Sequence, residues 1–243
     1  MTEAAPSCTF TTGPLSMAGY IGLPAPGCEV RLVPVDGKFE GRFCGPHIMP
    51  GYWRAPEQTA EVFDEQGFYC SGDAIKLADP NRPQLGLMFD GRIAEDFKLS
   101  SGVFVSVGPL RNRAVLEGSP YVQDLVIAAP DRECLGALVF PRLYECRRLA
   151  GLNADASDAD VLASAPVRQW FGDWLQRLNR DATGNASRLE WIALLDEPAS
   201  IDRGEITDKG SINQRAVLQW RAAKVEALYR GEDAAILRAE PKP

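Results

Sequence analysis

The side chains that could do chemistry gather in three glycine-centred stretches before residue 100. They read Cys44-Gly-Pro-His-Ile-Met-Pro-Gly-Tyr-Trp53, Tyr69-Cys-Ser-Gly-Asp73 and Phe89-Asp-Gly-Arg-Ile-Ala-Glu-Asp-Phe-Lys98. Glycine permits sharp turns, and loops built on such turns often carry binding or catalytic groups. Each stretch alone is also typical of an ordinary turn with a solvated charge. Only the order and spacing of all three together favour a functional site.

The overall charge argues against a nucleic-acid partner. The 243 residues include 26 Lys and Arg and 33 Asp and Glu, which gives a net charge of −7. The acidic residues are scattered, whereas a nucleic-acid groove needs a clustered basic face. No stretch approaches the roughly 18 to 20 apolar residues that cross a bilayer, and the N-terminus lacks a basic segment followed by an apolar one. We therefore expect a cytoplasmic protein with no membrane partner.

The cysteines predict a reduced protein rather than a disulfide framework. There are six, widely spaced and without a Cys-x-x-Cys pair, and the single histidine is His47. A chain of this size does not need disulfide bonds for stability, so the cysteines are interpreted as mostly structural. One histidine excludes a His-rich metal site. It also leaves a Ser-His-Asp triad only at His47, a turn position that disfavours this role.

The elements around the first two stretches are predicted to be short antiparallel strands. Residues 28–34 alternate apolar and polar side chains, Asp36-Gly37 is typical of a tight hairpin turn, and residues 39–43 return. Further strands are expected at 68–70, 74–77 and 86–89. Frequent Gly and Pro exclude helices longer than about two turns. This segment is therefore expected to be a small antiparallel barrel or sheet.

Helical periodicity first appears beyond a boundary predicted near residues 92 to 96. A helix is expected from Ser164 through Leu178, because its apolar side chains recur at helical spacing and form one buried face. The other elements expected here are a hairpin at 97–99 and 103–107, a helix at 109–116, strands at 121–128, 134–140 and 189–195, and a terminal helix at 212–229. The fold class predicted for the whole chain is α+β.

Taken in order, the three stretches resemble the adenylate-forming superfamily of acyl-CoA ligases, luciferases and peptide-synthetase adenylation domains. In that superfamily a Gly-Tyr-Trp loop and a Glu-Thr-rich segment, here Pro56-Glu-Gln-Thr59, precede a Thr/Ser-Gly-Asp step and then Gly-Arg. Residues 1–6 look like the end of its Gly-x-Thr-Glu motif, and residues 22–27 resemble the segment that comes after that motif. The stretches 91–99 and 204–215 look like the feruloyl-CoA synthetase branch, whose members are ligases of hydroxycinnamic and related aryl acids.

The resemblance implies a two-step reaction that uses ATP, Mg²⁺ and coenzyme A. A carboxylate and ATP give an acyl-adenylate, and the thiol of coenzyme A then displaces AMP. By resemblance Glu3 holds Mg²⁺ and Thr2 hydrogen-bonds the phosphate. Asp73 matches the aspartate that accepts hydrogen bonds from the ribose hydroxyls, and Arg92 matches the arginine that also reaches the ribose. The alternative for this pair is a capped turn and a surface ion pair.

The same resemblance assigns residues to a mobile C-terminal domain. The hinge position is Ala94, where many relatives have Asp or Lys, so this departure leaves hinge mobility open. Lys98 and Gly102 lie on the hairpin implied to pass close to coenzyme A, although Lys98 is equally typical of a solvated strand lysine. Lys209 matches the adenylating lysine, except that Gly210 follows it where relatives have a glycine before the lysine. The alternatives are an inert loop lysine, with Arg215 or no residue carrying the charge.

The resemblance begins inside a motif, so we expect the C-terminal portion of a ligase. The Ser/Thr/Gly-rich phosphate loop of the superfamily has no counterpart in the sequence. Residues 1–92 are expected to end the large AMP-binding domain and residues 93–243 to form the mobile domain. Such a chain is expected to be inactive alone and to associate with itself or with the missing portion. The alternatives are a stand-alone interaction module, or the activating part of a carboxylate reductase or peptide synthetase.

Overall fold

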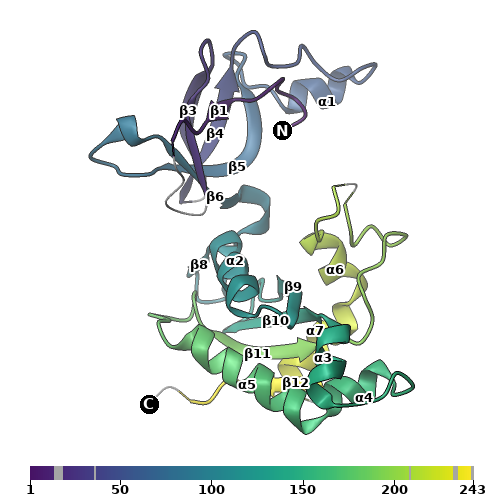
Figure 1. Cartoon of the computed structure of the whole chain (residues 1–243). Helices are drawn as coiled ribbons and strands as arrows, with labels where there is room; N and C mark the ends of the chain where they lie inside the picture. Colours follow the sequence, from purple (N-terminus) through teal and green to yellow (C-terminus); the bar gives the residue numbers. More distant parts are fainter. Residues whose placement is uncertain (14–18, 36, 208, 232–234, 242–243) are drawn as a thin grey trace. The chain divides into compact units, whose positions relative to one another are not determined.

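The chain divides into two compact units, Met1–Asp96 and Phe97–Pro243 (Figure 1). The computed structural model describes residues 1–13, 19–35, 37–207, 209–231 and 235–241. The division falls between Asp96 and Phe97, at the end of the interval in which the sequence predicts a boundary. The chain is a mixture of helices and sheets, which confirms the predicted α+β class.

The first unit is an antiparallel sheet with strand order β1-β2-β6-β5-β4-β3. Its strands are β1 (Thr9–Phe10), β2 (Tyr20–Pro24), β3 (Glu29–Val35), β4 (Lys38–Cys44), β5 (Tyr69–Leu77) and β6 (Leu87–Arg92). One short helix, α1 (Pro56–Glu61), and two 3₁₀ turns, η1 (Pro83–Leu85) and η2 (Ile93–Glu95), complete it. The strands predicted at 68–70 and 74–77 are one strand, β5, whose pairing with β4 shifts register between them.

The predicted hairpin at 28–43 is confirmed as β3 and β4. The strands pair in register from Glu29 opposite Cys44 to Val35 opposite Lys38. Gly37 has φ of +86°, a conformation that glycine adopts without steric cost. Residue 36, the other turn position, lies outside the described residues. The hydrophobic cluster of this unit is small and comprises Ala4, Cys8, Cys28, Phe43, Ile75 and Leu87.

The second unit is built on a four-stranded sheet with order β12-β11-β10-β9. Strands β10 and β11 run parallel, and the other neighbours are antiparallel. The strands are β9 (Val122–Ile127), β10 (Leu135–Pro141), β11 (Leu189–Leu194) and β12 (Ile236–Arg238), and a separate hairpin pairs β7 (Phe97–Lys98) with β8 (Phe104–Val105). The helices are α2 (Val107–Glu117), α3 (Leu143–Ala150), α4 (Asp158–Ala163), α5 (Ala165–Asn179), α6 (Gln214–Trp220) and α7 (Ala222–Arg230).

Both faces of this sheet are buried. Along β10, Ala137 and Val139 join a cluster with α2 and α5, whereas Leu138 and Phe140 join a second cluster with α6 and α7. Strand side chains alternate between faces, so a strand covered on both sides is apolar at every position. The helix predicted from residue 164 is confirmed as α5, whose stripe is buried except for the partly buried Trp170.

The prediction of one terminal helix over 212–229 is wrong. Two helices, α6 and α7, occupy this region, and they meet at Arg221, whose φ of −103° and ψ of 25° leave the helical range. The guanidinium of Arg221 is buried against the Glu205 carboxylate. This long-range ion pair breaks the helix at a point where the helical spacing of the apolar residues continues. The helices α1, α3 and α4 and the strands β1, β2 and β12 were also not predicted. None of the described helices has the length and apolar character needed to span a membrane.

Candidate functional site

Asp73 lies at an irregularity of β5 that its own neighbours hold in place. The Gly72 amide, at a residue with φ of +68°, donates to the Glu40 carboxylate at 3.0 Å, and the Asp73 amide donates to Ser71 Oγ at 3.1 Å. Ser71 in turn donates to the Gly41 carbonyl at 2.5 Å. Glu40 is buried and also binds Arg42 at 2.9 Å. A buried carboxylate therefore replaces the ladder bonds that the bulge interrupts.

Arg92 is the cross-strand partner of Asp73. The two residues stand opposite each other in the β5–β6 ladder, with Asp73 half-buried and Arg92 exposed. Residues opposite each other in an antiparallel pair present their side chains on the same face, about 5 Å apart at Cβ. The two strands thus bring together the two residues that the resemblance assigns to the ribose.

The N-terminal segment supplies a second carboxylate to the same neighbourhood. The Tyr69 hydroxyl donates to Tyr52, and the Tyr52 hydroxyl donates to Glu3 Oε1 at 3.3 Å. Burial, this hydrogen bond and the negative charges of Glu3 and Asp73 raise the pKa of Tyr69 well above its ordinary value of 10. Tyr69 therefore stays a neutral hydrogen-bond donor, and both carboxylates lie close enough to influence it.

Backbone contacts fix Glu3 beside the Gly-Tyr-Trp loop. The Glu3 carbonyl accepts from the Met49 amide at 2.8 Å. Thr59 of α1 closes the loop, because its Oγ1 accepts from the Tyr52 amide at 2.9 Å and donates to the Ala55 carbonyl at 2.8 Å. A side chain at Gly51 would meet Thr59 at 2.7 Å, so glycine is required there. The threonine of the Glu-Thr-rich segment therefore shapes the loop that contacts Glu3.

The donor set at Glu3 fits Mg²⁺. This ion is typically held by one or two carboxylates, with water and phosphate oxygens completing the octahedron. Glu3 is half-buried, and its Oε1 accepts one hydrogen bond, which leaves carboxylate oxygen available as a ligand. Thr2 is exposed next to it.

The segment after Arg92 carries the predicted hinge. Ala94 is exposed within the 3₁₀ turn η2. On its far side, Asp96 forms a buried ion pair with Lys38 of β4 at 2.7 Å, and Lys38 also donates to the Asp90 carbonyl at 2.6 Å. Lys38 was missed in the sequence, because its strand position near a hairpin turn is typical of a solvated lysine. Lys38 thus contacts the chain on both sides of this turn, at Asp90 before it and at Asp96 after it.

The predicted coenzyme A residues share the β7–β8 hairpin of the second unit. Lys98 is exposed and stands opposite Phe104. Gly102 has φ of +79°, and its amide donates to the Leu99 carbonyl at 2.8 Å. Apart from the two adjacent residues, no atom of the described part of the chain lies within 4 Å of the place where a side chain at Gly102 would begin. The backbone conformation, and not a close neighbour, requires glycine at this turn.

Lys209 lies at the tip of a narrow loop in the second unit. Ile206 bridges Ile212, the Thr207 amide donates to the Ser211 carbonyl at 2.9 Å, and the Gly210 amide donates to the Thr207 carbonyl at 2.8 Å. Lys209 itself is exposed. Asp208, which precedes it in the predicted motif, lies outside the described residues. Arg215, the alternative cation, is exposed in α6.

A buried ion pair anchors the base of this lysine loop, defined here as residues 204–213. Glu205 is fully buried and receives two bonds from Arg221, at 2.7 and 2.8 Å. Its other contact is the Ser200 amide at 2.8 Å, and Arg221 also donates to the carbonyls of Glu197 and Pro198. Arg221 holds the pKa of Glu205 below its ordinary value. No local pattern predicts this pair, because its members are far apart in the chain.

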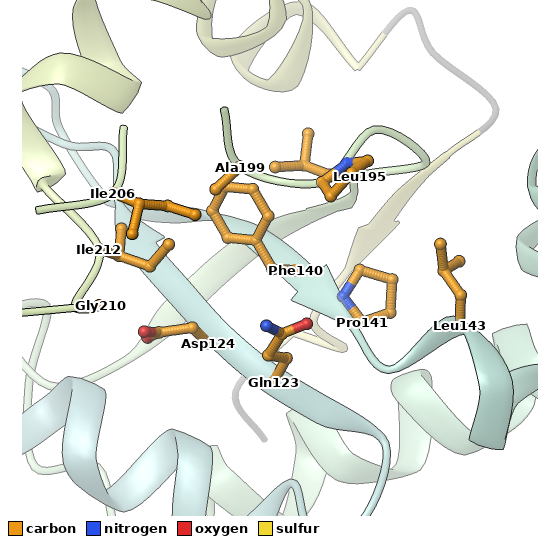
Figure 2. A pocket seen from close by; sticks show the side chains of 11 residues that line it. Gln123, Asp124, Phe140, Pro141, Leu143, Leu195, Ala199, Ile206, Gly210 and Ile212 are labelled. Carbon is orange, nitrogen blue, oxygen red and sulfur yellow. The ribbon is translucent and has the colours of Figure 1, made fainter. Parts of the chain in front are cut away.

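A cavity of about 480 Å³ lies beneath the lysine loop. Figure 2 shows Ile206 and Ile212 of the loop near the Phe140 ring, with Gln123 and Asp124 on the neighbouring strand. Asp124 is paired with Arg111 at 2.5 and 2.7 Å. The lysine loop thus covers a cavity and is not packed tightly against the sheet.

The structure brings together some of the predicted residues and leaves others separate. Glu3, Asp73 and Arg92 belong to one corner of the first unit, and Lys98 and Gly102 share one hairpin of the second. Lys209 has its own loop in that second unit. The six cysteines are free, and burial raises the pKa of Cys8 to about 12 and that of Cys146 to about 11, so these two thiols are protonated at neutral pH.

Known proteins with related sequences include a fatty-acid ligase and a carboxylic acid reductase. No family model matches the chain. It is 24% identical over 243 residues to a chloroplastic long-chain-fatty-acid–[acyl-carrier-protein] ligase of Arabidopsis thaliana, with 94% of this chain and 32% of the relative covered. It is 30% identical over 184 residues to the carboxylic acid reductase of Segniliparus rugosus, with 75% of this chain and 14% of the relative covered.

A solved structure has a similar fold. The adenylation domain of carboxylic acid reductase from Segniliparus rugosus, in complex with AMP and a co-purified carboxylic acid, matches with a TM-score of 0.66 and 26% identity. The match covers 84% of this chain and 32% of that domain. The chain thus spans about a third or less of each of these three proteins. These relatives and this structure support the adenylate-forming superfamily of acyl-CoA and acyl-carrier-protein ligases as the family to which the chain is related.

Proposed function

We propose that this chain supplies the ribose-binding corner, the hinge and the adenylating lysine of an ATP-dependent ligase that joins a carboxylic acid to coenzyme A. The observation that carries the proposal is one corner of the first unit. Hydrogen bonds there link the Tyr69 and Tyr52 hydroxyls to the Glu3 carboxylate. Asp73 lies close to Tyr69, and Arg92 is the cross-strand partner of Asp73. An ionised carboxylate accepts from both ribose hydroxyls, and a guanidinium donates to oxygen without competing for the same groups.

Glu3 is proposed as the ligand of Mg²⁺ and Thr2 as a hydrogen-bond donor to the α-phosphate. A bound Mg²⁺ would supply positive charge to the phosphate oxygens. Tyr52 orients the Glu3 carboxylate by its hydrogen bond at 3.3 Å, and Tyr69 holds Tyr52. Because Tyr69 remains protonated, the two hydrogen bonds keep one direction: Tyr69 donates to Tyr52, and Tyr52 donates to Glu3.

Lys209 is proposed to place its ammonium on the carboxylate and phosphate oxygens during adenylation. A flexible ammonium suits this task, because negative charge from two reactants must gather at one point. The loop supports the proposal, since its base is held by Glu205 and Arg221 while its tip is exposed over the cavity. Lys98 and Gly102 are proposed to line the path of coenzyme A, and Ala94 to be the hinge between the two half-reactions.

The acid is proposed to be an aryl acid of the hydroxycinnamic type, such as ferulate. This rests on the resemblance of residues 91–99 and 204–215 to the feruloyl-CoA synthetase branch. A second candidate is the activating step of a carboxylate reductase, which is favoured by the 26% identity and TM-score of 0.66 to the adenylation domain of such an enzyme. The sequence contains no Ser/Thr/Gly-rich phosphate loop, so we propose that the whole reaction needs further residues.

ATP–pyrophosphate exchange tests the proposal. The 243-residue chain alone should give no exchange with ferulate. A chimera in which it replaces the matching third of the carboxylic acid reductase adenylation domain should give exchange. In that chimera Lys209→Ala should abolish exchange yet spare thioester formation from supplied acyl-adenylate.

The matched control is Lys224→Ala, a half-buried lysine of the same unit that pairs loosely with Asp196 at 3.7 Å. It should leave both steps unchanged. Robust exchange by the chain alone would contradict the requirement for further residues. Undiminished exchange in the Lys209→Ala chimera would remove this lysine from the mechanism.

A further inference from the structure

Three side chains from parts of the first unit that are distant in sequence converge at one place. The ligand atoms of Cys8, Cys28 and His47 all lie within 4.8 Å of one another. Both cysteines are buried, each with 9% of its surface exposed, and His47 is half-buried. Two thiols and an imidazole are the donor set that binds soft and borderline metal ions such as zinc.

Backbone hydrogen bonds fix each of the three positions. The Cys8 carbonyl accepts from the Ala25 amide at 2.9 Å, and the Cys28 amide donates to the Ala25 carbonyl at 2.9 Å. The His47 carbonyl accepts from the Ala5 amide at 2.9 Å. The three side chains are therefore presented by one rigid framework of turns, as a metal site requires.

One ring nitrogen of His47, Nε2, is buried without a hydrogen bond to the described residues. A side chain at Gly45 would begin 2.7 Å from the ring Cε1 and 2.4 Å from the Gly27 carbonyl oxygen, so only glycine lets the ring occupy this place. A buried polar atom without a hydrogen-bond partner lowers the stability of the fold by about 1–3 kcal/mol. A metal ion bound to this nitrogen would take the place of the missing hydrogen bond.

We propose that Cys8, Cys28 and His47 bind one zinc ion, with water as the fourth ligand. Zinc–sulfur and zinc–nitrogen bonds of tetrahedral sites place their ligand atoms about 3.5–3.8 Å apart, which the present separations reach by closing about 1 Å. Binding forms two zinc–sulfur bonds and one zinc–nitrogen bond and releases the two thiol protons to solvent. No electron transfer is involved.

The site has a structural consequence that is independent of the ligase proposal. The bound ion connects the N-terminal segment to the turn before β3 and to the loop after β4. The isolated bridge between Ala4 and Ile48 lies beside this connection. Zinc is therefore expected to stabilise the first unit, because an ion that binds only the folded state shifts the unfolding equilibrium toward that state.

The test uses the full 243-residue chain without a histidine tag, reduced with a phosphine and stripped with a chelator. Titration with zinc chloride and elemental analysis after dialysis should give one zinc per chain. Cobalt chloride should give a thiolate-to-cobalt charge-transfer band and the visible bands of tetrahedral coordination. Cys8→Ser, Cys28→Ser and His47→Ala should each weaken zinc binding by at least about tenfold, because even the loss of an outer-shell partner has effects of this size.

Cys134→Ser is the matched control, since this free cysteine belongs to the second unit and is remote from the three ligands in sequence. It should bind zinc as the parent does. The stoichiometry and cobalt spectrum of the parent chain do not depend on any variant folding. Zinc far below one per chain, or octahedral cobalt bands, would overturn the proposal. So would equal loss of zinc in Cys134→Ser.

Discussion

Lys38 and Asp96 form a buried ion pair across the end of the first unit. Their charged atoms are 2.7 Å apart, and the side chains are only 7% and 2% exposed. The pair joins strand β4 to the last residue before the division between the units. The predicted hinge at Ala94 therefore lies within a segment that is fastened at its far end, and any swing must take place around this anchor or break it.

Lys38→Met is expected to destabilise the first unit by about 3–5 kcal/mol, because it leaves the Asp96 carboxylate buried without its cation. Urea unfolding followed by fluorescence gives the free energy. The control is Lys76→Met, which removes a 52% exposed lysine that pairs with Asp90 at 2.6 Å. It should cost less than about 1 kcal/mol. Equal effects of the two variants would refute the anchoring role of Lys38.

Glu205→Gln is expected to cost about 3 kcal/mol at pH 7, because Arg221 loses its buried counter-charge. Arg221 lowers the pKa of Glu205 from its ordinary value of 4.5, so this stabilisation is fully present above about pH 4.5 and is lost as the pH falls through the folded-state pKa. The unfolding free energies of parent and variant, measured from pH 7 to pH 3, should therefore converge at the acidic end. Glu226→Gln, which removes a 53% exposed partner of Arg132, should show no such convergence.

Asp73→Asn is expected to weaken nucleotide use in the chimera by about tenfold to a hundredfold, because a charge-assisted hydrogen bond contributes about 1.5–3 kcal/mol. The amide keeps the shape of the carboxylate but accepts at one oxygen only. The KM for ATP in the exchange assay measures the effect. Asp79→Asn, at a turn aspartate that pairs with Arg82 at 2.7 Å, should leave the KM unchanged. An unchanged KM in Asp73→Asn would contradict the ribose assignment.

Gly102→Ala is expected to strain the β7–β8 turn by about 1–2 kcal/mol, because φ is +79° and no neighbour obstructs the methyl group. Thioester formation from supplied acyl-adenylate should slow in the chimera, whereas exchange should not. Gly184→Ala is the control, since that loop glycine also has open space around it and is not among the glycines with positive φ. If both half-reactions slow equally, Gly102 has no specific part in the thioester step.

Sequence patterns predicted the elements whose signals are local. Alternation in residues 28–34 followed by Asp-Gly predicted the β3–β4 hairpin, and the apolar stripe of α5 predicted its buried face. The resemblance to a known family supplied the site residues, of which Glu3, Asp73 and Arg92 share one corner.

The elements that were missed depend on contacts between distant residues. The break between α6 and α7 follows from Arg221 reaching Glu205, 16 positions earlier. The bulge at Asp73 depends on Glu40, and the Cys8–Cys28–His47 cluster forms only when three turns meet. No spacing or periodicity in the sequence predicts these contacts between distant residues, because each partner alone is typical of an ordinary strand or loop.

Every residue of strand β10, from Leu135 to Pro141, is buried, whereas Lys209 and Gly210 at the tip of the lysine loop are exposed. Amide protons of β10 can therefore reach deuterated solvent only when the whole second unit unfolds, and those of the loop tip reach it by local opening. The slow protons report the global stability of the unit, and the fast ones report the motion of the loop. One labelling time course thus separates a variant that unfolds this unit from a variant that only alters the movement of its lysine.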